Sequence, residues 1–185
     1  MQKRSHRLLA AALLESNSGF SARRYEAAFL FGSFQPDCNP LSYLKGSRRA
    51  RFLRGHNYDN SCQYLFSHID RLQSCRRWSL WHYYTLGKLT HYLADAFTYP
   101  HNSTYHDSLA AHRRYEAELR MYLENVLRRH TVAQEERRED LTAALKQLHE
   151  RYLSRASDLR RDAVYICKAN ALLLASCLPL IQQVG

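Results

Sequence analysis

Residues 91–102, with the sequence HYLADAFTYPHN, contain two histidines and an aspartate whose spacing allows metal binding. His91 and Asp95 are four residues apart, so on a helix both side chains project from the same face. His101 follows Pro100, which marks the end of such a helix. Imidazole nitrogen and carboxylate oxygen are ligands of zinc, and one helix can supply two of them. A single pair of this kind is also typical of a surface ion pair, so other ligands are needed.

A second pair with the same spacing occurs in HRRYE, where His112 and Glu116 are four residues apart. Both pairs fall in segments that we predict to be helical, and His101 lies between them. Such a combination is less easily accidental than one pair. Imidazole and carboxylate ligands suit several ions, so the pattern indicates a metal site without excluding iron or manganese.

Three residues upstream extend this candidate ligand set. His6 lies near the start of the first predicted helix, where a buried structural role or a helix-cap role is the alternative. Asp37 is in SFQPDCNP, and because prolines lie on both sides of it we predict that a loop holds this carboxylate. His56, in RGHNYDN, falls at the end of the same predicted loop.

The elements that must position these residues are predicted to be helices. The 185 residues include only four prolines and six glycines, and Leu, Ala, Arg and Glu recur at helical spacing. We therefore expect an all-α protein in which residues 1–185 form a single-domain bundle of about six to eight helices. Residues 1–120 would hold the metal-site half, and residues 121–185 the C-terminal helices. Helices are predicted at about 5–15, 22–33, 60–73, 78–98, 104–129, 134–155 and 157–182.

Two of these helices carry specific expectations about burial. In the helix at about 78–98, Trp81, Tyr84, Leu89 and Leu93 are predicted to form the buried apolar face. The helix at 134–155 alternates charge signs and is predicted to be exposed to solvent and stabilised by ion pairs.

The net charge is +10, which is compatible with an anionic partner such as phosphate, nucleic acid or acidic lipid. A solvated basic surface explains the same charge equally well. The five cysteines include no C-x-x-C pair, and we interpret them as reduced thiols. The first residues imitate a secretory signal but fit an amphipathic helix better, and no apolar segment is long enough to span a bilayer. These features predict a cytoplasmic protein without a transmembrane segment.

Taken in order, His6, GSFQPD, GHN, LGKLTHYLADAFTYPHN and HRRYE resemble the zinc-dependent phospholipase C family. That family shares its helical fold with single-strand nucleases of fungi and plants. The most specific part of the resemblance is the order H-x-x-x-D-x-x-x-x-x-H followed by H-x-x-x-E. The resemblance extends from His6 to about Glu116, and the C-terminal helices match only in being helical.

The resemblance implies a cluster of about two to three zinc ions, with these ligands assigned residue by residue. The chain departs from secreted members at two points: it has no tryptophan near His6, where their N-terminal tryptophan completes the third site, and Cys38 follows Asp37, where choline-cleaving members have an aromatic residue. By resemblance, Asp37, His56, His91 and Asp95 would hold one zinc ion, His101, His112 and Glu116 a second, and His6 together with Asp95 a third.

The activity implied by the resemblance is the hydrolysis of a phospholipid or related phosphodiester by a metal-activated water. Asp37 would act as general base or orient the water, and Asp95 would bridge the metal ions. Two alternatives remain open: a single-strand nuclease or nucleotide phosphatase on the same metal core, and a non-catalytic member that keeps the metal. The basic run GSRRARFLR is compatible with peripheral contact with an anionic membrane, and a solvated loop explains it equally well.

Overall fold

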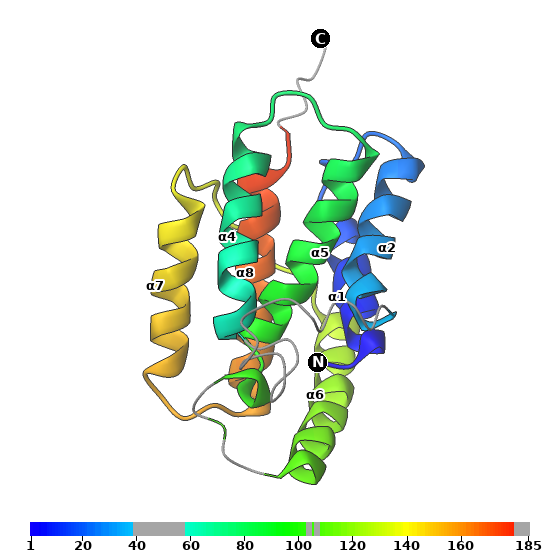
Figure 1. Ribbon diagram of the computed structural model, residues 1–185. Helices are drawn as coiled ribbons and strands as arrows, with labels where there is room; N and C mark the ends of the chain where they lie inside the picture. The colour runs from blue at the N-terminus through cyan, green and yellow to red at the C-terminus, as the bar shows by residue number, and fades with distance from the viewer. Residues whose placement is uncertain (39–57, 103–104, 106–107, 180–185) are drawn as a thin grey trace.

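The computed structural model describes residues 1–38, 58–102, 105 and 108–179 (Figure 1). All regular secondary structure in these residues is helical: there are seven α-helices, one short 3₁₀ helix and no strand. This confirms the all-α prediction. The elements are α1 (Lys3–Glu15), α2 (Arg23–Cys38), α4 (Tyr58–Ser74), α5 (Leu80–Ala96), η2 (Tyr99–His101), α6 (Leu109–Arg129), α7 (Leu141–Leu153) and α8 (Leu159–Cys177).

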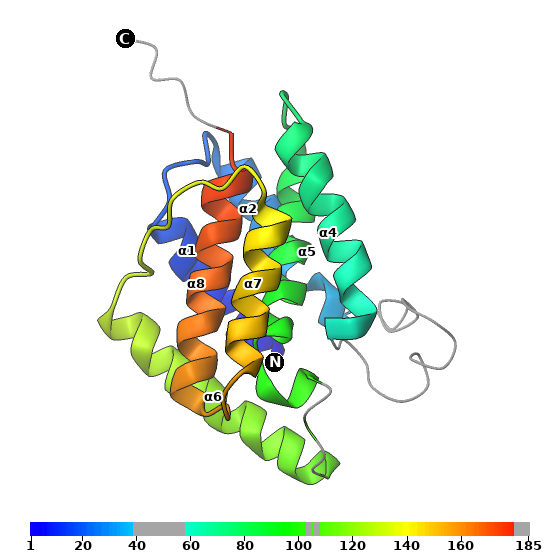
Figure 2. The same ribbon diagram turned by 90° about the vertical axis from the view of Figure 1, so that its left-hand side faces the viewer.

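Helix α5 is the central element of the bundle. It contacts α1, α2, α4 and α8, and nearly all its side chains from Tyr83 to Ala96 are buried. Figures 1 and 2 show α2 and α7 on opposite sides of the bundle, while α6 crosses it at the end where α5 finishes. His91 and Asp95 therefore belong to a helix that is enclosed by its neighbours.

Two glycines bring α2 and α5 into close contact. A Cβ atom on Gly87 would lie 2.1 Å from the carbonyl oxygen of Phe29, and one on Gly32 would lie 2.1 Å from the carbonyl oxygen of Tyr84. Any larger residue would therefore push the two backbones apart. This close packing places the C-terminal end of α2, which carries Asp37, beside the last turns of α5.

Side-chain caps fix where the three C-terminal helices begin. At the start of α6, α7 and α8 an acidic or hydroxyl side chain accepts a hydrogen bond from the backbone N–H three residues later, as is usual at helix N-termini. The cap of α7 is Asp140, so the segment 134–140, which is predicted to be helical, precedes the helix instead. The capping residues are Ser108, Asp140 and Asp158.

Three of the sequence predictions are wrong in detail. Asp37 does not lie in a loop, because α2 continues through Pro36 to Cys38. A proline inside a helix lacks one backbone hydrogen bond and crowds the preceding turn, and the packing of the buried Pro36 in the bundle offsets this cost. Trp81 is not part of the buried face of α5, since its side chain is 68% exposed. Helix α7 is not mainly exposed, because Leu141, Leu145, Leu148 and Tyr152 turn one face into the core.

Two further findings concern the membrane and the cysteines. None of the described helices is both long enough and apolar enough to cross a bilayer.

All five cysteines are free thiols, as expected, and Cys177 is the most deeply buried of them.

Candidate metal centre

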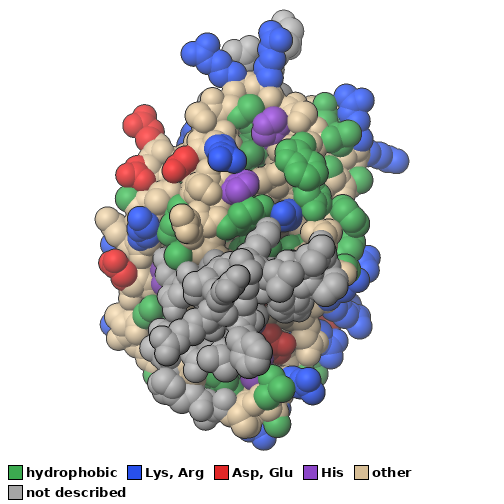
Figure 3. Space-filling model, in the orientation of Figure 1, with side chains coloured by type: hydrophobic (Ala, Val, Ile, Leu, Met, Phe, Trp, Pro, Cys, Tyr) green, Lys and Arg blue, Asp and Glu red, His purple; other side chains and the backbone are tan. Residues whose placement is uncertain are grey.

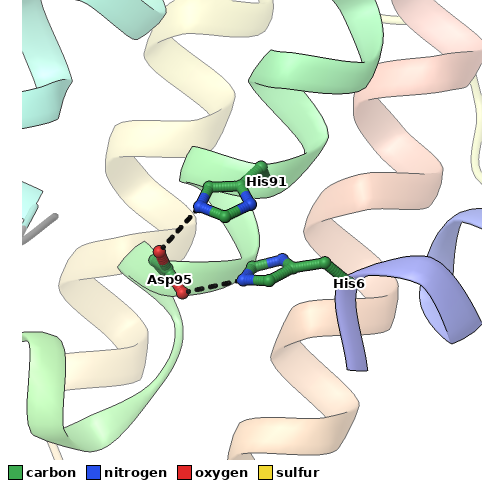
Figure 4. A group of neighbouring side chains, drawn as sticks. All are labelled: His6, His91 and Asp95. Carbon is green, nitrogen blue, oxygen red and sulfur yellow. Dashed lines mark ion pairs between the residues drawn. The ribbon is translucent and has the colours of Figure 1, made fainter. Parts of the chain in front are cut away.

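The first group of candidate ligands comes from two helices, with His6 on α1 and His91 and Asp95 on α5 (Figure 4). His6 Nε2 lies 3.4 Å from Asp95 Oδ1, and His91 Nε2 lies 3.4 Å from Asp95 Oδ2. The two imidazole rings are stacked, with their centroids 3.7 Å apart. All three side chains are buried, so two imidazole nitrogens lie close to one carboxylate in an enclosed space. We call His6, His91 and Asp95 the first triad.

The first triad has the hydrogen-bonding pattern of a metal site. His91 Nδ1 donates to the carbonyl oxygen of Ser33 at 2.9 Å, which orients its Nε2 toward Asp95. Neither ring nitrogen of His6 forms a hydrogen bond within the described residues, although the ring is almost completely buried. Buried polar atoms normally have a partner, and a metal ion bound to this donor set would provide one. The residues present therefore fit zinc.

The second triad consists of His101, His112 and Glu116, supplied by η2 and α6. Glu116 Oε1 lies 3.0 Å from His101 Nε2 and 3.2 Å from His112 Nε2. These side chains are partly buried, with 11%, 25% and 15% of their surfaces exposed for His101, His112 and Glu116. The second triad is therefore more open to solvent than the first.

The two triads are adjacent. Asp95 Oδ1 lies 3.9 Å from His101 Nε2, so a single carboxylate reaches both groups. The amino nitrogen of Met1 lies between them, 2.7 Å from Asp95 Oδ1, 2.9 Å from Glu116 Oε1 and 2.8 Å from His101 Nε2. A positive charge is favourable at this position because two carboxylates face it, and a divalent cation has the same complementarity.

Electrostatics keep both triad carboxylates ionised. Burial acts to raise the pKa of Asp95, but the Met1 amino group and the surrounding histidines outweigh burial and hold the pKa well below its usual range. Burial likewise opposes ionisation of Glu116, and hydrogen bonds from His101 and His112 hold its pKa low. Burial would lower the pKa of the Met1 amino group, yet Asp95 and Glu116 together raise it to about 10. Both carboxylates are therefore ionised, and their negative charge favours a cation between them.

Asp37 lies at the edge of the first triad. Its Oδ1 is 3.6 Å from His91 Nε2, and its Oδ2 is buried with no hydrogen-bond partner within the described residues. Burial is the largest effect on Asp37 and raises its pKa, and the interaction with the neighbouring His6 only partly offsets it. A carboxylate with a raised pKa takes up a proton more readily than Asp95 does.

Asp162, a residue of α8, helps to position η2 and therefore His101. The backbone N–H of Tyr99, the first residue of η2, donates to Asp162 Oδ2 at 2.9 Å. The same carboxylate accepts hydrogen bonds from the hydroxyls of Tyr115, Tyr152 and Ser157. Asp162 thus ties η2, α6 and α7 to α8 from a fully buried position.

The structure brings together most of the residues singled out from the sequence. His6, which the resemblance assigns to a separate third site with Asp95, stacks directly on His91. His56 lies outside the described residues. Sequence reasoning missed the Ser33 carbonyl, which a sequence cannot reveal, and Asp162, whose only signal is an acid in the first turn of α8, where acids are common. The residues that do converge are His6, Asp37, His91, Asp95, His101, His112 and Glu116.

The helical bundle brings two histidine–carboxylate triads together at one end, and each triad has ligands of the types that bind a metal ion. A model of the family described as zinc dependent phospholipase C matches residues 5–159. Because the match covers most of the chain, this protein belongs to that family. The match also extends beyond Glu116, the last of the motif residues. No curated protein and no solved structure matches the chain significantly.

Proposed function

We propose that this protein is a zinc-dependent hydrolase of phosphodiesters and that its substrate is a phospholipid or a closely related phosphodiester. The observation that carries the proposal is the adjacency of the two triads, which share Asp95 through its 3.9 Å approach to His101. Membership of the zinc-dependent phospholipase C family supports the same class of substrate.

Each triad would hold zinc: the first with His6, His91 and Asp95, the second with His101, His112 and Glu116. When bound, zinc would polarise the phosphodiester and lower the pKa of a bound water from about 15.7 to about 7. Asp95 would bridge the two sites and set their spacing, since it contacts histidines of both triads. We assign His56, which lies outside the described residues, to the same centre on the basis of the sequence resemblance alone.

Asp37 is the candidate general base. Its raised pKa lets it accept a proton from the attacking water, and its place beside His91 puts it at the edge of the first triad. Asp95 and Glu116, whose pKa values are held low, would remain ionised and bind metal throughout. The carboxylates thus divide into one that moves a proton and two that hold charge.

The test compares Asp37→Asn with wild-type protein and with Cys38→Ser, a matched control at the next position, whose exposed side chain is outside the triads. Each zinc-loaded protein is assayed on a short-chain phospholipid and on single-stranded DNA. We expect wild type and Cys38→Ser to hydrolyse the phospholipid and Asp37→Asn to be slower by roughly a thousandfold with its zinc retained. Full activity of Asp37→Asn would remove Asp37 from the mechanism.

The same assay separates the alternatives. Hydrolysis of DNA alone would contradict the phospholipase proposal and support the alternative hypothesis of a single-strand nuclease. The net charge of +10 leans slightly towards that alternative. Zinc bound at both triads without hydrolysis of either substrate would identify a non-catalytic member of the family. Both results would contradict the proposed function while leaving the metal centre intact.

A further inference from the structure

The outer face of α2 and α5 carries four aromatic side chains that are packed against one another, two of them exposed and two half-buried. Trp81 and Phe31 are 68% and 53% exposed, although large apolar side chains are normally buried. The Trp81 and Tyr84 ring centroids are 4.9 Å apart, and Phe31 lies 5.9 Å from Tyr84 and 5.6 Å from Phe34. We call Phe31, Phe34, Trp81 and Tyr84 the aromatic patch.

Positive side chains border the aromatic patch. Lys3 Nζ and Arg7 Cζ, both from α1, lie 5.1 Å and 5.5 Å from the centre of the Phe34 ring. Lys88 Nζ lies 5.6 Å from the centre of the Tyr84 ring. Figure 3 shows hydrophobic side chains over this side of the molecule with Lys and Arg side chains along its edge. The patch thus combines apolar rings with a cationic rim.

We propose that the aromatic patch is a docking surface for a lipid bilayer that contains anionic lipids. Tryptophan and phenylalanine enter the boundary between head groups and acyl chains, and lysine and arginine next to them attract anionic head groups. The cationic rim complements anionic head groups, and Leu80, an aliphatic residue that is also exposed beside Trp81, adds apolar surface that can contact acyl chains.

A single-stranded nucleic acid fits the aromatic patch less well. Bases stack on ring faces that are open to solvent, whereas the patch rings turn their faces and edges toward one another. Phe31 meets Phe34 at 86°, edge to face, and Trp81 is tilted by 35° against Tyr84. Leu80 offers no ring for stacking. A bilayer, which requires only apolar bulk and nearby cations, matches these features better.

The docking surface is also close to the metal centre. Phe34 and Asp37 are one helical turn apart on α2, and His6 of the first triad lies between Lys3 and Arg7 in the sequence of α1. A bilayer bound by the patch would therefore lie near the side of the bundle that carries Asp37. Binding itself does not rest on the proposed hydrolysis, because a chain without metal would keep the same surface.

The test measures binding of the full zinc-loaded chain to phosphatidylcholine vesicles with and without about one third phosphatidylglycerol. In a Trp78→Phe background Trp81 is the only tryptophan, so its fluorescence reports directly on the patch. We expect binding to the anionic vesicles with a blue shift of Trp81 emission, and weaker binding to phosphatidylcholine alone.

Two double variants and a control resolve the contributions. Phe31→Ser/Trp81→Ser should weaken binding to the anionic vesicles by about tenfold or more, because two inserted rings are lost; since this variant lacks the Trp81 reporter, its binding is measured by co-sedimentation with the vesicles, beside wild type. Lys3→Gln/Arg7→Gln should abolish the preference for anionic vesicles. The control, Leu153→Ala/Val164→Ala, removes exposed apolar side chains from α7 and α8 and should bind as wild type does.

Three results would overturn the proposal. The first is the absence of binding to either vesicle; the second is equal loss of binding in the control and in the aromatic variant. The third is quenching of Trp81 by oligothymidylate without any response to vesicles, which would assign the patch to nucleic acid. Because vesicle binding is read without turnover, failure here is distinguishable from failure of the proposed hydrolase activity.

Discussion

At the scale of single residues, Asp95 links the two halves of the metal centre. Its Oδ1 faces His6, His101 and the Met1 amino group, and its Oδ2 faces His91. A buried carboxylate is stable only where cations or donors compensate for lost hydration. The arrangement explains why these residues occur together: each histidine has a carboxylate, and the two groups of ligands share one.

Glu116 allows a direct test of the second triad. We expect Glu116→Gln to lose about one zinc ion per chain, because a neutral amide is a much weaker zinc ligand than a carboxylate. The measurement is zinc content by elemental mass spectrometry after purification without chelator. Glu118→Gln is the matched control, since Glu118 lies on the same helix with its side chain 48% exposed and should keep all the zinc. Equal zinc in both variants would contradict the assignment of Glu116.

The residues of the centre could be predicted only where side-chain type and spacing carry the information. His91 with Asp95 and His112 with Glu116 follow from four-residue spacing, whereas His6 and Asp37 were candidates from their local sequence, and the resemblance to the family assigned their roles. The Ser33 carbonyl that orients His91 has no side-chain signature. A backbone group contributes geometry that appears only once two helices are packed.

At the scale of elements, the contact between α2 and α5 positions Asp37 and the Ser33 carbonyl against His91. We expect Gly87→Ala to destabilise the fold by about 3 kcal/mol, because the added methyl would meet the Phe29 backbone, which cannot move away alone. The free energy of unfolding, measured by urea denaturation, checks this.

Gly19→Ala is the control for that substitution. Among the described residues, the three atoms nearest to its Cβ all belong to the flexible Leu178 side chain, whose Cδ1, at 2.8 Å, can rotate aside. The change in unfolding free energy should therefore be clearly smaller than for Gly87→Ala. Similar losses at both positions would mean that the α2–α5 contact is not unusually tight.

The connection between α8 and η2 is a second element-level feature. Asp162→Asn replaces one acceptor oxygen by a donor that faces hydroxyl groups and an N–H, and we expect a loss of stability of about 2 kcal/mol. Because η2 carries His101, zinc affinity at the second triad should fall as well, which competition with a fluorescent chelator can measure. Asp140→Asn, an exposed helix cap that asparagine also satisfies, should change neither quantity. Unchanged zinc affinity in Asp162→Asn would contradict the positioning role.

Element boundaries were predicted less well than element types. Helix α2 runs through Pro36 because burial against α5 outweighs the loss of one backbone hydrogen bond. Helix α7 begins only after Asp140, although the charged segment before it has helical periodicity. In both cases tertiary packing or a cap decided the boundary, and neither is visible in local periodicity.

At the scale of the whole molecule, the composition was sufficient to predict an all-helical bundle, because glycine, proline and β-branched runs are scarce. Composition could not predict that α5 would be central or that Trp81 would face outward, since these depend on which helices pack together. The family match through residue 159 extends the relationship through α7, a helix that carries none of the metal-site motifs.

The most direct test of the account is the zinc content of the whole chain, purified without chelator or affinity metal and measured by elemental mass spectrometry. We expect about two to three zinc ions per chain, two of them held by the two triads. A ratio near zero that persists after zinc is supplied would contradict it, because the histidines and carboxylates would then be structural ion pairs.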